Sequence, residues 1–428
     1  MTAYRGIISW QDNAVATLII FRLLLLVMVT LADVKTAKRR IDAYIIKTPV
    51  IYSPSLSKLT GARVYLKLEN LQIAGSFKVR GAVNKIQKMR KTLPKKGVIA
   101  ASAGNHAQGV VVAAHAAGVP ATVVMPEWSS VSKQEATRRY GADVVVHGKT
   151  IGESIGYAEK LAGEGRLFIH PYDDEDVIAG QGTIALEILA DLPETDQIIV
   201  PVGGGGLIAG IAAAAKTLCP ALSVVGAQAA TCPSAVEAKN AGAPVSVPAC
   251  GTLADGIRVS RIGERTFPLI CRYVDRIVTA TDDEIADAML LLLERKHIVA
   301  EGAGAIPLAV LMNGSAGVLP GSTVVLVISG GNVDSPLLFR VVRHALARKG
   351  RIMSFSVMLE DQPGSLAGLT AVIAEKKGNV LDIRPMQAGA GSPVHAVRVY
   401  LEVETRGSEH AAEVQTALAD AGYALRPE

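Results

Sequence analysis

Residues 197–216 read QIIVPVGGGGLIAGIAAAAK and join three patterns: an apolar strand, four consecutive glycines and an Ala-rich helix. The strand pattern, Gln197–Val202, is apolar after its first residue, as in strands buried on both faces of a parallel sheet. The glycines, Gly203–Gly206, free successive backbone N–H groups at the start of the helix, where they can hold a phosphate. The stretch therefore predicts an α/β fold with an anion site where a strand leads into a helix.

Strand and helix patterns alternate along the middle of the chain. Apolar strand patterns lie at residues 64–68, 97–102, 120–125, 142–146, 223–228 and 321–329, with helix patterns at 107–118 and 133–140 between them. This alternation predicts parallel, doubly wound sheets. Ligands of such sheets bind beyond the carboxyl ends of the strands, so the loops there carry the candidate functional residues.

Composition limits the class of protein. A chain of 428 residues is long enough for two or three domains. A net charge of +5 and only 4% aromatic residues argue against a nucleic-acid partner. The four cysteines fit neither a zinc site nor a disulfide framework, so we expect no metal, reduced thiols and a cytoplasmic protein.

The N-terminus carries an apolar stretch, Ala14–Ala32, in which Arg22 is the only charged residue. Its 19 residues have the length of a membrane span, but a central arginine is costly there. We expect translation to start at Met28, which makes residues 1–27 an upstream part of a hydrophobic extension over 1–34. A membrane anchor is the alternative.

Three more loops follow strands or open helices. The first, Gly75–Gly81, reads GSFKVRG and places Lys78 near a helix N-terminus, where the local positive field would lower its pKa and suit it to imine chemistry; a solvated lysine is the alternative. The second, Ser102–His106, offers N–H groups and side-chain donors to a carboxylate or phosphate. The third, Ser329–Asn332, reads SGGN and can present a hydroxyl to a ligand; an ordinary turn is the alternative.

A dinucleotide site is a rival interpretation of the glycine loop. Gly204–Ala209 matches the pattern GxGxxA. That pattern requires an acidic residue at the end of the next strand to bind the ribose. The next strand ends at Gln228, which argues against a nicotinamide enzyme.

Together these loops resemble the threonine dehydratase (threonine ammonia-lyase) family of fold-type-II pyridoxal-phosphate (PLP) enzymes, over about residues 35–345. The resemblance rests on GSFKVRG (75–81), SAGNHAQG (102–109), HP (170–171), IAGQGT (178–183), PVGGGG (201–206), ADGI (254–257), EGAG (301–304) and SGGN (329–332). It implies a two-lobed catalytic domain, with a small lobe of about residues 72–160 inserted in the large lobe. It also implies PLP as cofactor and conversion of L-threonine to 2-oxobutanoate and ammonia, and of L-serine to pyruvate.

The resemblance also implies a role for each matching residue. Lys78 would bind PLP covalently and move the Cα proton, with Phe77 packed beside the ring. Asn105 would bond the phenolic oxygen of PLP, and Ser329 the ring nitrogen. The phosphate would be held by Gly203, Gly204, Gly205 and Gly206, and the substrate carboxylate by Ser102, Ala103, Gly104, Asn105 and His106.

Other activities of the same fold are alternatives. Serine racemases place a serine where this chain has Ala103, and Ala103 has no proton to give to the opposite face of the substrate. Some relatives bind a divalent cation through a carboxylate where this chain has Gln228, so no such metal site is expected. A hydroxyaspartate dehydratase and a non-catalytic amino-acid sensor are further alternatives, and retention of Lys78 argues against the sensor.

The tail, residues 351–428, has a pattern of its own. Strand and helix signals predict the order βαββαβ, including a strand over 394–403, and Asp361–Leu366 reads DQPGSL, which resembles an ACT domain. That resemblance implies a homodimer or homotetramer and an effector such as isoleucine or valine at Asp361, Gly364 and Asn379. A purely structural dimerisation lobe is the alternative.

Overall fold

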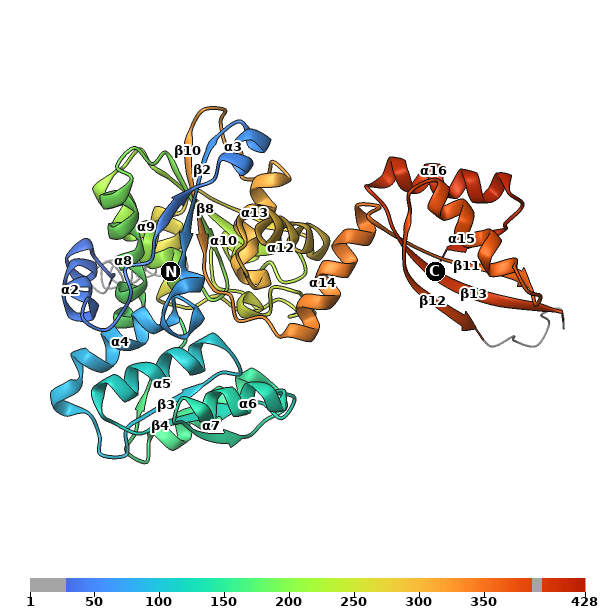
Figure 1. Cartoon of the computed structure of the whole chain (residues 1–428). Helices are drawn as coiled ribbons and strands as arrows, with labels where there is room; N and C mark the ends of the chain where they lie inside the picture. The colour runs from blue at the N-terminus through green and yellow to red at the C-terminus, as the bar shows by residue number, and fades with distance from the viewer. Residues whose placement is uncertain (1–27, 387–394, 428) are drawn as a thin grey trace, which may run out of the picture. The chain divides into compact units, whose positions relative to one another are not determined.

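The computed structural model describes residues 28–386 and 395–427, which divide into two compact units between Val333 and Asp334 (Figure 1). The expected catalytic domain, 35–345, extends beyond this division. The difference is helix α14 (Ser335–Arg348), whose Val341 and Ala345 are buried and whose Arg343 bonds Glu402 of the second unit. These contacts place α14 with the second unit rather than the first.

The first unit contains two sheets. The six-stranded sheet of the large lobe has the order β1-β2-β10-β7-β8-β9. Its strands are β1 (Val50–Tyr52), β2 (Arg63–Leu68), β10 (Thr323–Ile328), β7 (Gln197–Pro201), β8 (Ser223–Ala229) and β9 (Arg276–Ala280). All neighbouring strands are parallel except β1, which pairs antiparallel with β2. The predicted parallel α/β architecture is confirmed.

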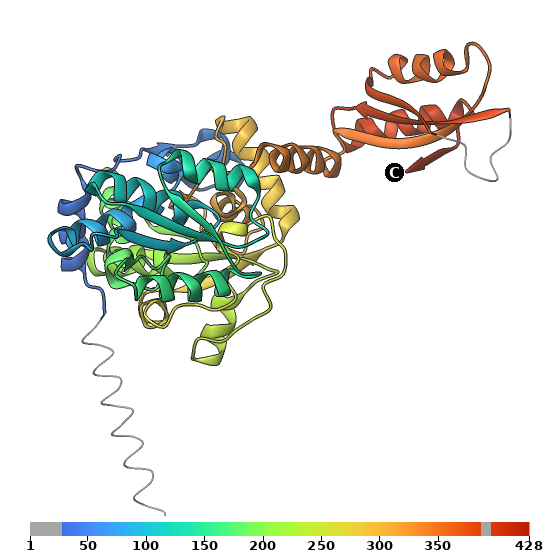
Figure 2. The same ribbon diagram turned by 90° about the horizontal axis from the view of Figure 1, so that it is seen from below.

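The small lobe is built on a four-stranded parallel sheet of order β5-β4-β3-β6. Its strands are β3 (Val98–Ala101), β4 (Ala121–Met125), β5 (Asp143–Val146) and β6 (Leu167–Phe168). They lie between β2 and β7 in the sequence, so this lobe is an insertion that extends beyond residue 160. Figure 2, seen from below, shows the small lobe in front.

Helices cover the faces of these sheets. Those of the first unit are α2 (Leu31–Ile41), α3 (Pro54–Thr60), α4 (Lys78–Lys88), α5 (Asn105–Ala117), α6 (Val131–Arg139), α7 (Ile151–Ala162), α8 (Glu175–Asp191), α9 (Gly206–Leu218), α10 (Ser234–Ala241), α11 (Thr266–Tyr273), α12 (Asp282–Lys296) and α13 (Gly302–Met312). Alternate residues of β3 serve two cores: Val98 and Ala100 pack with α4 and α5, whereas Ile99 and Ala101 pack with α7. This two-sided burial explains why β3 is apolar along its whole length.

The predicted strands of the catalytic region are all present, and their ends lie within two residues of the expected ones. The structure adds β1, β6 and β9. Strands β1 and β6 contain three and two residues, too few to show a periodic pattern. Strand β9 has partly exposed residues and no continuous apolar run.

The second unit has the predicted order of strands and helices. After α14 come β11 (Ile352–Glu360), α15 (Ser365–Glu375), β12 (Asn379–Met386), β13 (Ala396–Glu404), α16 (Ser408–Asp420) and β14 (Leu425–Pro427). The antiparallel sheet has the order β12-β13-β11-β14, and α15 and α16 pack on one face of it. Val394, the expected first residue of the third strand, lies outside the described residues.

No helix in the described parts of the chain is long and apolar enough to cross a membrane. Most of the apolar stretch 14–32 lies outside those parts, and so do residues 1–27 of the expected extension. Thr30 caps α2 in a capping box with Asp33, and Val34 and Ala37 of α2 enter the core of the large lobe.

Candidate active site

Lys78 is the first residue of α4, and two contacts fix where this helix begins. Ser76 forms an antiparallel bridge with Gly330, and the N–H of Phe77 donates to the carbonyl of Ser329 at 3.1 Å. The sequence-predicted residues Lys78 and Ser329 therefore lie side by side, although 251 positions separate them in the chain. Phe77 precedes Lys78 as the helix N-cap, with the Lys78 Nζ 5.2 Å from its ring centroid.

The amine of Lys78 points to the loop after β6. Its Nζ donates to the carbonyl of Pro171 at 2.9 Å. The imidazole of His170 shapes that loop, because its Nδ1 accepts from the N–H groups of Tyr172 and Asp173. Burial lowers the pKa of Lys78 to about 8, although Glu301 acts in the opposite direction. A fraction of the amine is therefore unprotonated near neutral pH, as a nucleophile or base requires.

The loop Ser102–His106 joins β3 to α5. Ser102 accepts through its Oγ from the N–H of Gly104 at 3.1 Å, and the side of Gly104 on which a Cβ would stand is open. The first N–H groups of a helix have no partner within the helix, so this loop can bind an anion. Ala103 is half-buried in the same loop.

The side chain of His106 is not available to a ligand. It is buried, and its Nε2 lies 2.8 Å from the carbonyl of Ile169, to which it must donate. Burial lowers its pKa to about 3, so the ring is neutral. His106 can therefore take part in carboxylate binding only through its backbone N–H.

Asn105 is held at both ends of its amide. Its Nδ2 donates to Glu301 Oε1 at 2.7 Å, and its Oδ1 accepts from Asn332 Nδ2 at 2.8 Å. These two bonds identify Nδ2 as the amide nitrogen of Asn105. The second hydrogen on Nδ2 can donate to an oxygen on a cofactor ring. Glu301 is buried, and burial raises its pKa to about 8, so it is protonated at neutral pH.

Glu301 was not among the residues predicted for the site. The motif EGAG contains it, and a carboxylate directly before an apolar helix is a usable signal. Its contact with Asn105 spans 196 positions, however, and nothing local indicates that distance.

The glycine loop joins β7 to α9 and leaves no room for side chains. A Cβ on Gly204 would stand 2.3 Å from the ring of Tyr172, and one on Gly206 would stand 2.8 Å from the Tyr172 carbonyl. Gly205 has φ +96°, a conformation that favours glycine. The backbone here can approach an anion closely, which suits the loop to the phosphate of PLP.

Ser329 follows the last residue of β10. Its side chain is buried, and its Oγ donates to the carbonyl of Ala303 at 3.3 Å. No carboxylate of the described residues is bonded to this hydroxyl, so a pyridine nitrogen placed here would have a neutral partner. The donor set fits PLP: an amine, a hydroxyl, an oriented amide and a glycine cradle.

Comparison with known proteins establishes the class. The family described as pyridoxal-phosphate dependent enzyme matches residues 41–330, and the chain belongs to this family. PLP is therefore its cofactor, as the sequence predicted.

Individual relatives within this family carry more specific names. The L-threonine ammonia-lyase of Thermotoga maritima is 42% identical over 93% of this chain and 99% of that protein. The L-threonine ammonia-lyase of Geobacter sulfurreducens is 45% identical over 91% of this chain and 97% of its own length. Among solved structures, the threonine deaminase of T.th. has a TM-score of 0.67 at 42% identity, covering 71% of this chain and 99% of that one. Maize serine racemase has a TM-score of 0.70 at 34% identity, covering 74% of this chain and 98% of that one.

Proposed function

We propose that this protein is a threonine ammonia-lyase that converts L-threonine to 2-oxobutanoate and ammonia, and L-serine to pyruvate and ammonia. The observation that carries the proposal is the position of Lys78: its amine is buried with a lowered pKa, and the backbone of the preceding residue, Phe77, is bonded to Ser329. Two relatives that match more than nine-tenths of this chain carry the name L-threonine ammonia-lyase.

In this proposal each side chain has a defined task. PLP, when bound, supplies the electron sink that makes the Cα–H bond of an amino acid acidic. Lys78 takes the Cα proton, and its pKa of about 8 keeps part of it in the basic form near pH 7. The backbone N–H groups of Ser102–His106 hold the substrate carboxylate in place.

Asn105 and Ser329 orient the ring. Glu301 and Asn332 hold the Asn105 amide, so its second Nδ2 hydrogen would be available to the ring oxygen of bound PLP. The Ser329 hydroxyl, which bonds the Ala303 carbonyl here, would turn its hydrogen to the ring nitrogen of bound PLP and would not stabilise a protonated ring as a carboxylate would. Loss of the β-hydroxyl is therefore favoured over transamination.

The racemase alternative is disfavoured by Ala103. Racemisation requires a proton donor on the face of the substrate opposite the lysine. In the loop Ser102–His106, position 103 carries a methyl group, which cannot donate a proton. We therefore expect D-serine to be a minor product at most.

The test is a product assay with the purified chain, PLP and L-threonine or L-serine. We expect 2-oxo acid and ammonia from the parent, and a loss of at least about 1,000-fold for Lys78→Ala, since it removes the nucleophile and base together. Lys85→Ala on the same helix is the matched control and retains activity. Bound PLP without product from either amino acid would contradict the substrate assignment, and a fully active Lys78→Ala would contradict the role of the lysine.

The second unit is proposed as an ACT-like regulatory domain that binds an aliphatic amino acid such as isoleucine or valine. Asp361 and Gly364 lie in the turn between β11 and α15, whereas Asn379 begins β12 at the opposite end of the sheet. Nine residues of β11 separate these ends by roughly 27 Å at 3.3 Å per residue. One site with all three residues therefore needs two copies, as antiparallel pairing of two β12 edges would allow.

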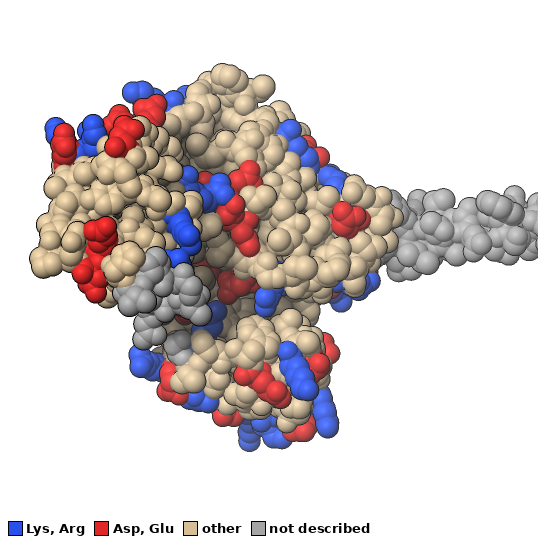
Figure 3. Space-filling view, turned by 90° about the vertical axis from the view of Figure 1, so that its right-hand side faces the viewer, with Lys and Arg blue, Asp and Glu red and all other residues tan. Residues whose placement is uncertain are grey.

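Two further proposals concern the type of partner, which we infer from the surface charges, and the cellular location, which we infer from the cysteines. On the face drawn in Figure 3, Lys and Arg alternate with Asp and Glu and form no continuous basic stripe. This distribution supports a small-molecule substrate rather than a nucleic acid. The four cysteines are free, which supports a cytoplasmic location.

A further inference from the structure

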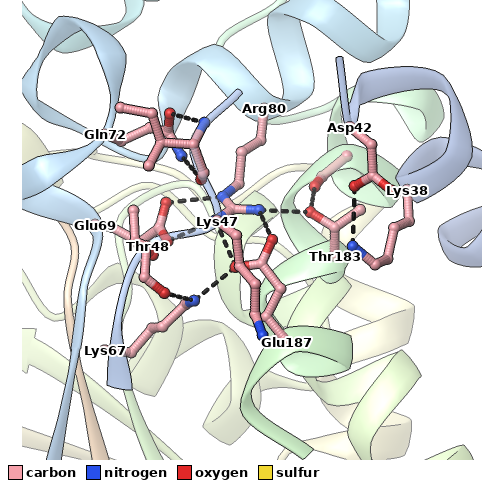
Figure 4. Close-up of polar contacts among 12 residues, drawn as sticks. Lys38, Asp42, Lys47, Thr48, Lys67, Glu69, Gln72, Arg80, Thr183 and Glu187 are labelled. Atoms are coloured by element: carbon pink, nitrogen blue, oxygen red, sulfur yellow. Dashed lines mark hydrogen bonds and ion pairs between the residues drawn. The ribbon is translucent and has the colours of Figure 1, made fainter. Parts of the chain in front are cut away.

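Four charged side chains form a buried ion cluster in the first unit: Lys67, Glu69, Arg80 and Glu187 (Figure 4). Their side chains are at most 1% exposed, and their formal charges sum to zero. They come from four elements, namely β2, the short 3-10 turn Glu69–Leu71 after it, α4 and α8. The proposed mechanism assigns no task to this cluster.

Arg80 is the centre of the cluster, because every N–H of its guanidinium has an acceptor. Nε and Nη2 each donate to Glu69 at 2.8 Å. Nη1 and Nη2 donate to the two oxygens of Glu187 at 2.7 and 2.9 Å, and Nη1 also donates to Thr183 Oγ1 at 3.1 Å. Five directed bonds from one planar group define its position and its orientation.

Lys67 and Thr48 complete the cluster. Lys67 Nζ donates to Glu187 Oε2 and to the Thr48 carbonyl, both at 2.6 Å, and Thr48 Oγ1 donates to Glu69 Oε1 at 2.5 Å. Burial alone would raise the pKa of Glu187, but the bonds from Arg80 and the charge of Lys67 outweigh it, and the pKa is lowered. Glu187 is therefore ionised at neutral pH.

The cluster joins the two lobes at the start of α4. Val79, Val83 and Ile86 of this helix pack in the core of the small lobe with α5. Arg80 turns away from that core and bonds to Glu69, at the end of a strand of the large sheet, and to Glu187 on α8. Arg80 thus bonds the first turn of this helix to both the large sheet and α8, whereas Asn84, Lys85 and Lys88 further along the helix bond to α8 or the residue before it.

Lys78 lies in that same turn, two residues before Arg80. Residues at i and i+2 of a helix face different sides, so the Lys78 amine reaches Pro171 while Arg80 reaches into the cluster. The N–H of Arg80 donates to the Phe77 carbonyl at 3.0 Å, which ties the two side chains to one rigid turn. A change in the guanidinium contacts is therefore transmitted to Lys78 through the backbone.

We propose that Arg80 is a positioning residue: its bonds to Glu69 and Glu187 hold the first turn of α4 on the large lobe and so set the position of the Lys78 amine relative to Ser329. The inference rests on the proposed role of Lys78. Apolar side chains of similar volume stabilise a fold about as well as a buried ion cluster does, but their contacts lack direction. The bonds of the ion cluster have fixed directions and so fix the position of the helix turn that carries Lys78. This position matters because a displacement of a reacting group by about 1 Å can lower the rate about 100-fold.

The main test uses a charge-balanced variant, Arg80→Met with Glu69→Gln, which leaves Lys67 and Glu187 as a neutral pair. Lys88→Met is the matched control, because Lys88 lies on the same helix in a half-exposed ion pair with Asp176. The first readout is the rate at which apoenzyme captures PLP covalently at Lys78, followed by absorbance and by borohydride trapping. The second is kcat and KM for L-threonine, and the third is the melting temperature.

For the double variant we expect capture and kcat to fall by about 100-fold, KM to change by less than about fivefold, and melting to stay within about 5 °C of the parent. The control keeps all parent values. A folded double variant with parent-like capture and kcat would overturn the proposal and leave the cluster a purely structural role.

A second variant covers the case in which the double variant does not fold. Arg80→Lys keeps the charge but cannot bond both carboxylates with directed pairs. We expect an intermediate loss of capture and kcat, about tenfold, and parent-like values would overturn the proposal. Capture of PLP does not depend on the substrate. A parent protein that captures PLP at Lys78 but does not convert threonine would therefore refute the proposed function, while the capture rates of the variants would still test the role of Arg80.

Discussion

Replacing Glu301 with glutamine gives a sharp prediction, because this buried carboxyl group is protonated in the folded protein at neutral pH. Burial raises its pKa from 4.5 to about 8, with Asp255 adding to the rise and Asn105, Lys133 and Lys78 opposing it. Glutamine has nearly the same shape and keeps an oxygen that can accept from Asn105 Nδ2. The substitution therefore removes the ionisation while retaining the bond.

The magnitude follows from proton linkage. An acid whose folded pKa lies above its unfolded pKa binds protons more tightly when folded, so the protein loses stability as the pH rises from the unfolded to the folded value. One pKa unit corresponds to about 1.4 kcal/mol, and the shift from 4.5 to about 8 gives about 5 kcal/mol above pH 8. Most of this difference develops between pH 5 and pH 8.

The assay is urea unfolding of the apoenzyme at pH 5, 6, 7, 8 and 9 for the parent and Glu301→Gln. We expect the variant to gain stability relative to the parent as the pH rises, by several kcal/mol between pH 5 and pH 8, and the gap to level off above pH 8. Glu194→Gln, which replaces an exposed carboxylate, is the matched control. A gap for Glu301→Gln that stays constant with pH would refute the raised pKa, and with it the neutral hydrogen-bond acceptor beside Asn105.

Further predictions concern the cofactor site and the second unit. Covalent capture of PLP by the apoenzyme should rise with pH through about 8, the pKa of Lys78, and a midpoint near 10.5 would contradict the effect of burial. Gly204→Ala places a methyl group against the Tyr172 ring and should weaken PLP binding at least tenfold in a fluorescence titration, whereas Gly156→Ala in α7, where a Cβ would have no neighbour within 4 Å, should not. Ser329→Asp should favour a protonated ring, lowering 2-oxobutanoate formation and raising the fraction of cofactor lost to transamination, as measured by absorbance. Truncation after Val333 should abolish any response to isoleucine or valine in the product assay, and an unchanged response would exclude the second unit as the effector site.

Much of the fold was predictable because its signals are local. A strand buried on both faces is apolar along its whole length, and a turn into a helix needs glycine where the backbone is crowded. The segment Gln197–Pro201 with Gly203–Gly206 shows both features, and the structure has β7 and the start of α9 there. The βαββαβ order of the tail was predictable for the same reason, although the place of α14 was not, because its buried face only becomes visible against β11 and β13.

The candidate site, like the fold, could be predicted only in part from the sequence. The sequence by itself determined the reactive groups, Lys78, Ser329 and the glycine loop, because each lies in a short motif whose chemistry depends on neighbours in the chain. Only the tertiary structure decided how they are held. Glu301 reaches Asn105 across 196 positions, and Arg80 reaches Glu187 across 107. Such contacts depend on which strands become neighbours in the folded sheets, and burial then sets the pKa of each group.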